Sequence, residues 1–173
     1  MQLKIQTDRL TLIPFTINIC QESLSNSFDI LASMGIFPGD GWPDLETLDT
    51  LPRIINNINK VSAPSGFESW MIVDTSNNLL IGDIGFKGIP NHDGEIDLGY
   101  GIIASQRKKG FAFESAAGIL KWAFEQGNVR AVTANCRIDN IGSQRILSLL
   151  NFSTIKKDSE MIYWRLAKGT KDC

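Results

Sequence analysis

The sequence predicts an α+β domain, a mixed α/β arrangement in which a largely antiparallel sheet carries helices on both faces. Three observations support this class. Apolar residues alternate with a period of two in several short segments, they recur at three- and four-residue steps in others, and the links between the middle strands are too short for crossovers. A chain of 173 residues is long enough to bury the core of one domain without a metal or a disulfide.

The predicted elements follow in the order β-α-α-β-β-β-α-β-α-β. Residues 9–15 alternate and predict a strand, and residues 17–33 show a weak helical pattern. A loop rich in glycine and proline is expected at 35–44. A helix is expected at 45–61, with Pro52 as a kink or a restart.

The second half of the chain is more regular. Three strands are predicted at 67–73, 79–87 and 95–103, and the short polar links between them favour hairpins. The remaining elements are a helix between Gly110 and Gly127, a strand at 129–136, a helix at 140–151 and a last strand at 161–166. The strand-helix-strand unit at 95–136 should be a right-handed parallel crossover.

Composition and charge argue against several classes of protein. The formal net charge is −2, without the basic footprint of a protein that lives on nucleic acid. Cys20, Cys136 and Cys173 lie far apart and His92 is the single histidine, so we expect free thiols and no metal site. We find no apolar stretch near 18 residues and no signal peptide pattern, so we expect a cytoplasmic protein without membrane contact.

Residues 105–116, SQRKKGFAFESA, place three cations before a glycine. Arg107, Lys108 and Lys109 follow the end of a predicted strand, and a helix begins after Gly110. Backbone N–H groups at a helix N-terminus bind anions, and glycine lets a phosphate approach the backbone closely. By themselves these residues are equally compatible with a solvated basic turn.

The strand at 95–103 has two chemically different faces. One face carries Glu95, Asp97, Gly99 and Gly101, and the other carries Ile96, Leu98, Tyr100 and Ile102. Two carboxylates followed by two glycines form an open acidic strip. Such carboxylates could act as a base, bind a cation, or lie on a solvated face of the sheet.

Five segments resemble one known family. Residues 107–112, RKKGFA, match the R/Q-x-x-G-x-G/A signature of the GNAT superfamily of acyl-CoA N-acyltransferases. TDRLTLIPF, LLIGDIGF, IDLGYGI and DNIGSQRILSLLNF are similar to segments of its ribosomal-protein N-terminal acetyltransferase branch, known as RimJ/RimL-like. Together they span nearly the whole chain in the order of the family.

The resemblance implies a GNAT-like fold in which the parallel strands at 95–103 and 129–136 splay apart around acetyl-CoA. It implies one domain over 1–173, with an acceptor-side region at about 17–66 and an acetyl-CoA core at about 67–167. Asp139 or Asn140 should cap the helix that follows. The residues expected to contact the cofactor are Tyr100, Ile102, Ile103, Arg107, Lys108, Lys109, Gly110, Phe111, Ala112, Asn140 and Ser143.

The implied reaction is direct attack of an amine on acetyl-CoA in a ternary complex. A neutral nitrogen is needed, so a base must remove a proton; Asp97 is the first candidate and Glu95 the second. A strand amide near Ile102 should stabilise the oxyanion.

The expected proton donor departs from the family pattern. Leu147 occupies the position where many members have a tyrosine, and Asn151 replaces the glycine before Phe152. Ser143 is therefore the candidate donor to the thiolate, with Tyr100 or water as alternatives.

The acceptor is expected to be a protein N-terminus or a small-molecule amine. Phe37, Trp42 and Phe67 are the candidate substrate-binding residues, and Trp70, Trp122 and Trp164 are expected in the core. A non-catalytic acyl-CoA-binding module is the alternative function. Whether the chain forms a homodimer is left open.

Overall fold

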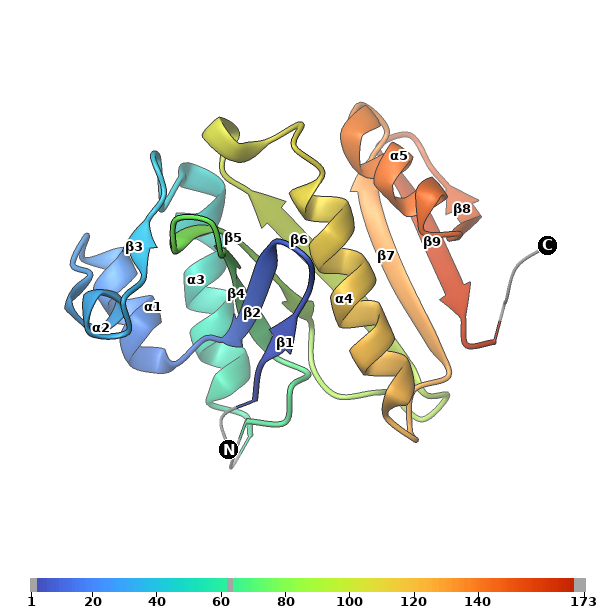
Figure 1. Ribbon diagram of the computed structural model, residues 1–173. Coiled ribbons are helices and arrows are strands. Elements are labelled where there is room, and N and C mark those ends of the chain that lie inside the picture. The colour runs from blue at the N-terminus through green and yellow to red at the C-terminus, as the bar shows by residue number, and fades with distance from the viewer. Residues whose placement is uncertain (1–2, 62–63, 170–173) are drawn as a thin grey trace.

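The computed structural model describes residues 3–61 and 64–169 and confirms the α+β class (Figure 1). The strands are β1 (Ile5–Gln6), β2 (Leu10–Pro14), β3 (Phe37–Pro38), β4 (Ser69–Asp74), β5 (Leu79–Phe86), β6 (Glu95–Ile102), β7 (Ala131–Arg137), β8 (Ser153–Lys157) and β9 (Met161–Ala167). The helices are α1 (Ile17–Leu24), α2 (Asp29–Ser33), α3 (Leu45–Ile58), α4 (Phe111–Glu125) and α5 (Ile141–Leu149), with a 3₁₀ turn at Ala104–Gln106.

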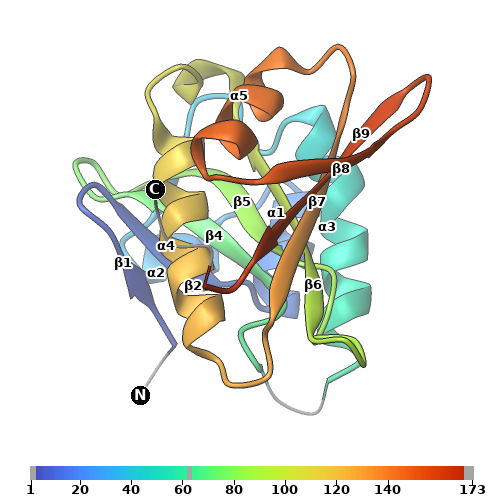
Figure 2. The same ribbon diagram turned by 90° about the vertical axis from the view of Figure 1, so that its right-hand side faces the viewer.

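These strands form one mixed sheet. Their order is β1-β2-β4-β5-β6-β7-β9-β8, and the short β3 pairs with β5. The pairs are antiparallel except β6–β7 and β3–β5, which are parallel. Helix α4 lies on one side of the sheet and α3 on the other (Figure 2). The antiparallel hairpins and the parallel crossover from β6 to β7 agree with the sequence prediction.

Several elements differ from the sequence prediction. The single helix expected at 17–33 is two helices, because the chain turns after α1 with Asn26 at a left-handed φ of 54°. Pro52 neither ends nor restarts α3, which continues through it with the proline ring exposed. Strands β1 and β3 have two residues each, too few to show a period, and all five residues of β8 are exposed.

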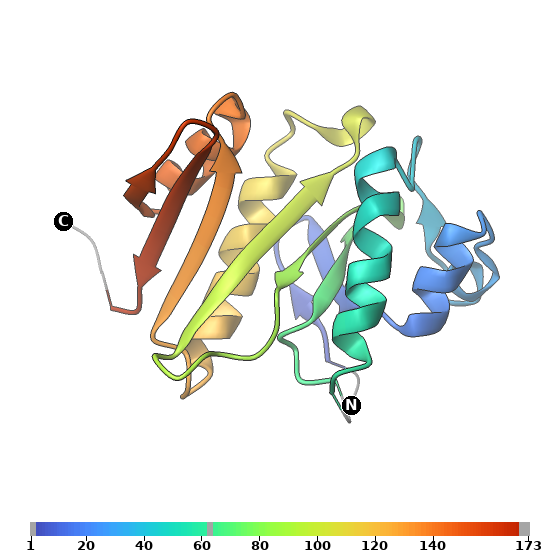
Figure 3. The same cartoon turned by 180° about the vertical axis from the view of Figure 1, so that it is seen from behind.

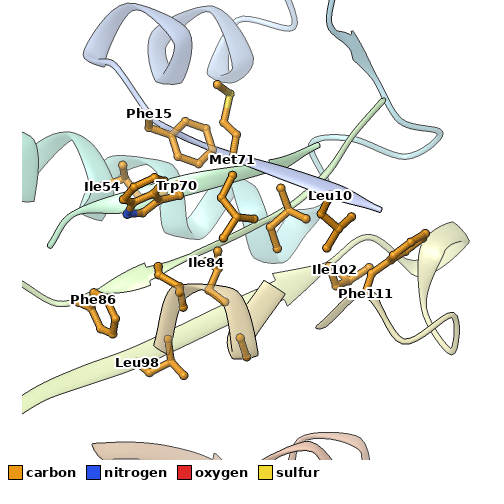
Figure 4. Close-up of a cluster of buried hydrophobic side chains, with 14 of the residues drawn as sticks. Leu10, Phe15, Ile54, Trp70, Met71, Ile84, Phe86, Leu98, Ile102 and Phe111 are labelled. Atoms are coloured by element: carbon orange, nitrogen blue, oxygen red, sulfur yellow. The ribbon is translucent and has the colours of Figure 1, made fainter. Parts of the chain in front are cut away.

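The core lies on both faces of the central strands (Figure 4). Trp122 of α4 contacts three aromatic rings, with centroid distances of 5.2 Å to Phe67, 5.6 Å to Trp70 and 6.5 Å to Phe86. Trp70 also donates its indole N–H to the carbonyl of Gly66 at 2.9 Å. This aromatic cluster fixes α4 against β4 and β5. Trp70, Trp122 and Trp164 all pack in the core, as the sequence predicted.

Loss of the Phe67 ring should destabilise the fold strongly. Phe67 is 6% exposed and packs against Trp122 and Phe86, so Phe67→Ala leaves a cavity and should lower the free energy of unfolding by about 3–5 kcal/mol. Phe37 is 52% exposed, so Phe37→Ala is the matched control and should change that free energy by less than about 0.5 kcal/mol. Urea unfolding measures both, and equal losses would contradict the assignment of Phe67 to the core.

Candidate active site

The central feature of the site is the separation of β6 from β7. The two strands pair only from Glu95–Ala131 to Leu98–Ala134, and beyond that β6 pairs with β5 alone and β7 with β9. The strands diverge from this point (Figure 3). A cavity of about 180 Å³, which we call the splay cavity, lies between them and reaches α5. Its lining residues are Lys87, Leu98, Gly99, Tyr100, Ala134, Asn135, Cys136, Asn140, Ser143 and Leu147.

The diverging part of β6 has a free backbone edge. Ile103 donates its N–H to the carbonyl of Ile81 in β5 at 3.0 Å, and alternate residues of an antiparallel strand point the opposite way. The N–H groups of Tyr100 and Ile102 therefore face the splay. The carbonyl of Ile102 accepts a hydrogen bond from Nε of Arg107 at 2.8 Å. Tyr100, Ile102 and Ile103 were all expected to contact the cofactor. Of these, Ile103 already donates its backbone N–H within the sheet.

The loop between β6 and α4 presents free amides at the start of a helix. Gly110 precedes α4 with a φ of 84°, and the adjacent Lys108 has a φ of 62°. Among the described residues no side chain caps α4, so the N–H groups of its first turn, at Phe111 and Ala112, are available to a ligand. The sequence predicted this arrangement.

Arg9 connects the β6–α4 loop to Glu114 of α4, and the sequence analysis gave it no role. Its Nη1 donates to the carbonyl of Lys109 at 3.0 Å, its Nε donates to Glu114 at 2.7 Å, and its guanidinium lies 4.7 Å from the centre of the Phe111 ring. Glu114 also accepts from Thr7 Oγ1 at 2.6 Å and from the Arg9 amide at 2.7 Å. Burial raises the pKa of Glu114, but the hydrogen bonds from Thr7 and Arg9 outweigh it and lower the pKa overall. We call these contacts the Arg9 clamp.

The three loop cations have different partners. Arg107, expected to contact the cofactor, points toward α3, where its Nη2 lies 3.5 Å from Glu46 and 4.0 Å from Asp44. Lys109 donates to the side chain of Gln106 at 2.8 Å. Lys108 is exposed on the loop. Arg107 therefore connects the loop to α3.

A second cavity, of about 450 Å³, lies on the other face of the sheet between α3, β5 and β6. We call it the α3 cavity. Gly99 and Gly101 of β6 and Gly85 of β5 line it with backbone alone, and Asp44 and Glu46 lie at its α3 side. The two cavities share Lys87, Gly99 and Tyr100, so they meet across β6.

Asp83 is a half-buried carboxyl group that lines the α3 cavity, and the sequence analysis did not select it. It lies on β5 opposite Gly101, and a Cβ at position 101 would stand 3.5 Å from its Oδ1. Burial, followed by the charges of Asp44 and Glu46, raises its pKa to about 7. The signal that could have found it is one acidic residue inside LLIGDIGF, a strand that is otherwise apolar.

The two carboxylates predicted as bases are paired with cations. Asp97 forms an ion pair with Lys87 and accepts from Thr133 Oγ1 at 3.0 Å, and Glu95 accepts from Nε of Arg165 at 2.7 Å. Neither lines the splay cavity or the α3 cavity. The acidic strip predicted on β6 is therefore charge-balanced.

The predicted α5 residues do come together at the splay cavity. Asn140 caps α5 by accepting from the amide of Ser143 at 3.0 Å, which settles the choice between Asp139 and Asn140. The hydroxyl of Tyr100 is buried without a hydrogen-bond partner among the described residues. Burial raises the pKa of Tyr100, and the nearby hydroxyl of Ser143 opposes part of that rise. Leu147, where the family tyrosine was expected, is buried in the same cavity.

The residues predicted to bind the acceptor do not gather at the α3 cavity. Trp42 is buried and stacks on Phe15 at 6.4 Å, Phe67 belongs to the aromatic cluster, and Phe37 is exposed on β3. Aromatic residues in a weakly patterned segment were the only basis for that prediction. Core packing explains two of them, because Trp42 stacks on Phe15 and Phe67 packs against Trp122 of α4.

Over residues 3–61 and 64–169, no helix is long and apolar enough to cross a membrane. Within the same ranges, no three histidine, cysteine, aspartate or glutamate side chains are grouped so as to hold a metal ion.

A parallel pair that splays beside an amide-rich helix start is the arrangement of an acyl-CoA-dependent acyltransferase, and comparison with known proteins agrees. Residues 9–153 match the family model of the acetyltransferase (GNAT) domain, and the chain belongs to this family. It is an N-acetyltransferase of the GNAT family.

One curated relative is an uncharacterized N-acetyltransferase, YjdG, of Bacillus subtilis strain 168, which is 30% identical over 160 residues, 92% of this chain and 95% of the relative. Among solved structures, the ribosomal-protein-S5-alanine acetyltransferase of Vibrio fischeri is 14% identical with a TM-score of 0.68, over 98% of each chain. The microcin C7 self-immunity acetyltransferase MccE, in complex with acetyl-CoA and AMP, is 14% identical with a TM-score of 0.65, over 93% of each chain. At these identities the structures show the shared fold.

The Arg9 clamp predicts that a residue outside the loop affects cofactor affinity. Arg9→Ala should raise the Kd for CoA by roughly 3- to 10-fold, the effect expected when a half-exposed ion pair no longer orders the loop. Arg130, exposed just before β7 at the opposite end of the sheet, gives the control Arg130→Ala, which should bind CoA as the wild type does. Isothermal titration calorimetry measures both, and equal affinities for the two variants would contradict a positioning role for Arg9.

The raised pKa of Asp83 predicts a pH-dependent cost in stability. The folded protein holds this proton more tightly than the unfolded chain, so the stabilising contribution is complete below about pH 4 and is lost as pH rises through about 7. Asp83→Asn should therefore exceed the wild type in free energy of unfolding by an amount that grows over this range, up to about 4 kcal/mol near pH 8. Urea unfolding at several pH values measures the difference. A difference that does not vary with pH would show that the pKa of Asp83 is not raised.

Proposed function

We propose that the chain transfers the acetyl group of acetyl-CoA directly to a primary amine within a ternary complex. The observation that supports this most is the meeting of two cavities across β6, where Gly99 and Tyr100 line both. One cavity lies between the splayed strands and suits the cofactor, and the other suits the acceptor. Two substrates held on opposite faces of one strand can react without a covalent enzyme intermediate.

The residues of the splay fit acetyl-CoA, which supplies an activated acetyl group as a thioester. The free N–H groups of Tyr100 and Ile102 on the β6 edge can bind an amide-rich arm, and the N–H of Ile102 can donate to the oxyanion that develops on the thioester. The uncapped amides of Phe111 and Ala112, with Gly110, can bind a pyrophosphate.

The remaining cofactor contacts come from both sides of the splay. Lys108 and Lys109 add positive charge beside the pyrophosphate, and Asn140 and Ser143 face the arm from α5. The buried, unpartnered hydroxyl of Tyr100 supports the assignment further, because a buried polar group without a partner is costly unless a ligand provides one.

Two hydroxyl groups can protonate the departing thiolate in place of the tyrosine that this chain lacks. Tyr100 and Ser143 both line the splay cavity, and Leu147 excludes water there. An alkyl thiol has a pKa of about 8.5, so partial protonation suffices near neutral pH.

On the acceptor side, the region at about 17–66 contributes α3 to the cavity wall within a single domain. The first proposed acceptor is a protein N-terminal amine, favoured by the ribosomal-protein acetyltransferases among the structural neighbours. A small-molecule amine is the second, favoured by the self-immunity acetyltransferase.

An amine-dependent release of thiol from acetyl-CoA tests the function. Hexapeptides with N-terminal serine or alanine, and spermidine, are supplied as acceptors, and we expect thiol release together with the mass shift of one acetyl group. Gly110→Glu should abolish both CoA binding and turnover while the thermal unfolding transition remains, because it adds bulk and negative charge at the pyrophosphate site.

Gly127→Glu is the matched control, since a side chain at Gly127 meets open space beyond the end of α4. CoA binding without thiol release for every amine would leave a non-catalytic acyl-CoA-binding module. Retained CoA affinity in Gly110→Glu would place the pyrophosphate elsewhere.

A further inference from the structure

Three acidic side chains line the α3 cavity, and of these only Asp83 forms no ion pair with another described residue. The other two acidic side chains in that cavity, Asp44 and Glu46, lie within 4.0 Å of Arg107. We propose that Asp83 binds the amine of the acceptor and accepts its proton before acyl transfer. This rests on the function proposed above and adds the position of the reacting nitrogen.

The geometry of β5 and β6 supports this position. Asp83 and Gly101 are partners in the antiparallel ladder, and the carboxylate lies where a side chain at position 101 would contact it. Gly99 has no side chain either, and a Cβ there would meet open space. Backbone alone therefore separates Asp83 from the free edge of β6. Neighbouring strands are about 4.8 Å apart, so a nitrogen above Gly101 can contact both the carboxylate and a thioester at that edge.

The surroundings leave this carboxylate free to bind a cationic amine. The charged and titratable groups that face it are Asp44, Glu46 and Arg53 of α3, Cys20 of α1, Tyr100 of β6, Lys87 at the end of β5, and Arg107 of the loop. Lys87 is paired with Asp97, and Arg107 is held by Ile102 and the α3 carboxylates. Burial, followed by the charge of Asp83, raises the pKa of the Cys20 thiol to about 12, so that thiol is not a competing base at neutral pH.

The pKa and the position of Asp83 both suit a general base. Burial and two neighbouring acids raise the pKa of Asp83 to about 7, where a general base works best at neutral pH. Asp97 instead forms an ion pair with Lys87 and accepts a hydrogen bond from Thr133 Oγ1. Asp97 also lies outside both cavities.

Two protons leave the acceptor nitrogen during the proposed acyl transfer. The ammonium group of the acceptor gives one proton to the Asp83 carboxylate and becomes a neutral amine. The nitrogen lone pair forms the C–N bond to the thioester carbonyl carbon, and the C–S bond breaks with its electron pair on sulfur. The second proton of the nitrogen passes to that sulfur, directly or through the hydroxyl of Tyr100 or Ser143. Asp83 returns its proton to water, and the products are an amide and a thiol.

The first test reads the carboxyl group directly and needs no turnover. In the full chain with CoA bound, ¹³C NMR of the aspartate carboxyl carbons should show one signal with a midpoint near pH 7 that is missing in Asp83→Asn. It should remain in Asp93→Asn, which removes an exposed carboxylate of the β5–β6 link. Adding n-butylamine should lower the midpoint by about one unit, because a bound ammonium favours the carboxylate.

A midpoint below about 5, or one that n-butylamine does not move, would overturn the proposal. If the midpoint behaves as expected but no amine in the panel is acetylated, the proposed function fails while the amine site at Asp83 stands.

The second test is kinetic and uses two acceptors, spermidine and the hexapeptide with N-terminal serine. The amines of spermidine titrate well above pH 7. Asp83→Asn should lower kcat/KM for the amine by roughly 10²–10⁴-fold and abolish the rise in rate near pH 7, while KM for acetyl-CoA stays close to the wild-type value. Asp93→Asn should match the wild type. If Asp97→Asn loses that rise and Asp83→Asn keeps it, the base is Asp97 and the proposal is wrong.

Discussion

The site depends on one constraint, the backbone hydrogen bonds that β6 loses when β7 leaves it after Leu98. A strand interior with unpaired N–H and C=O groups is costly, and those groups need a partner from outside the sheet. β5 still pairs with the other edge of β6 as far as Ile102, so this part of β6 stays within the sheet although one edge is free. The loop follows directly from this strand, and both cavities are lined by it.

Much of this arrangement could be predicted because it is local. The strand at 95–102, the glycine before α4 and a cap at Asp139 or Asn140 each follow from a few adjacent residues whose period or chemistry is distinctive, whereas the splay of β6 from β7 was expected from the family resemblance. The short strands β1 and β3 could not be predicted, because two residues have no period. Nor could β8, which pairs through its backbone while its side chains stay in solvent.

The site residues that the sequence missed are those whose role depends on residues far away in the chain. Arg9 acts through Lys109 and Glu114, more than ninety positions later, and Asp83 acquires its properties from burial and from α3. Conversely, Glu95 and Asp97 looked free because their cations, Arg165 and Lys87, cannot be paired with them from spacing alone. Charge along a strand predicts a chemical type, and only the tertiary partner decides whether that charge is available.

Arg107 contacts both β6, which borders the splay cavity, and the start of α3, which borders the α3 cavity. Its Nε is bonded to the end of β6, and its Nη2 lies between Asp44 and Glu46 at the start of α3. Those two carboxylates also act on Asp83. An anion that binds and shifts the loop therefore changes the electrostatic field at the proposed amine position, and with it the affinity for the amine. By thermodynamic reciprocity, an amine in the α3 cavity changes the affinity of the loop for the anion by the same factor as the anion changes the affinity for the amine. The affinities of the two proposed binding sites are thus coupled through a single guanidinium group.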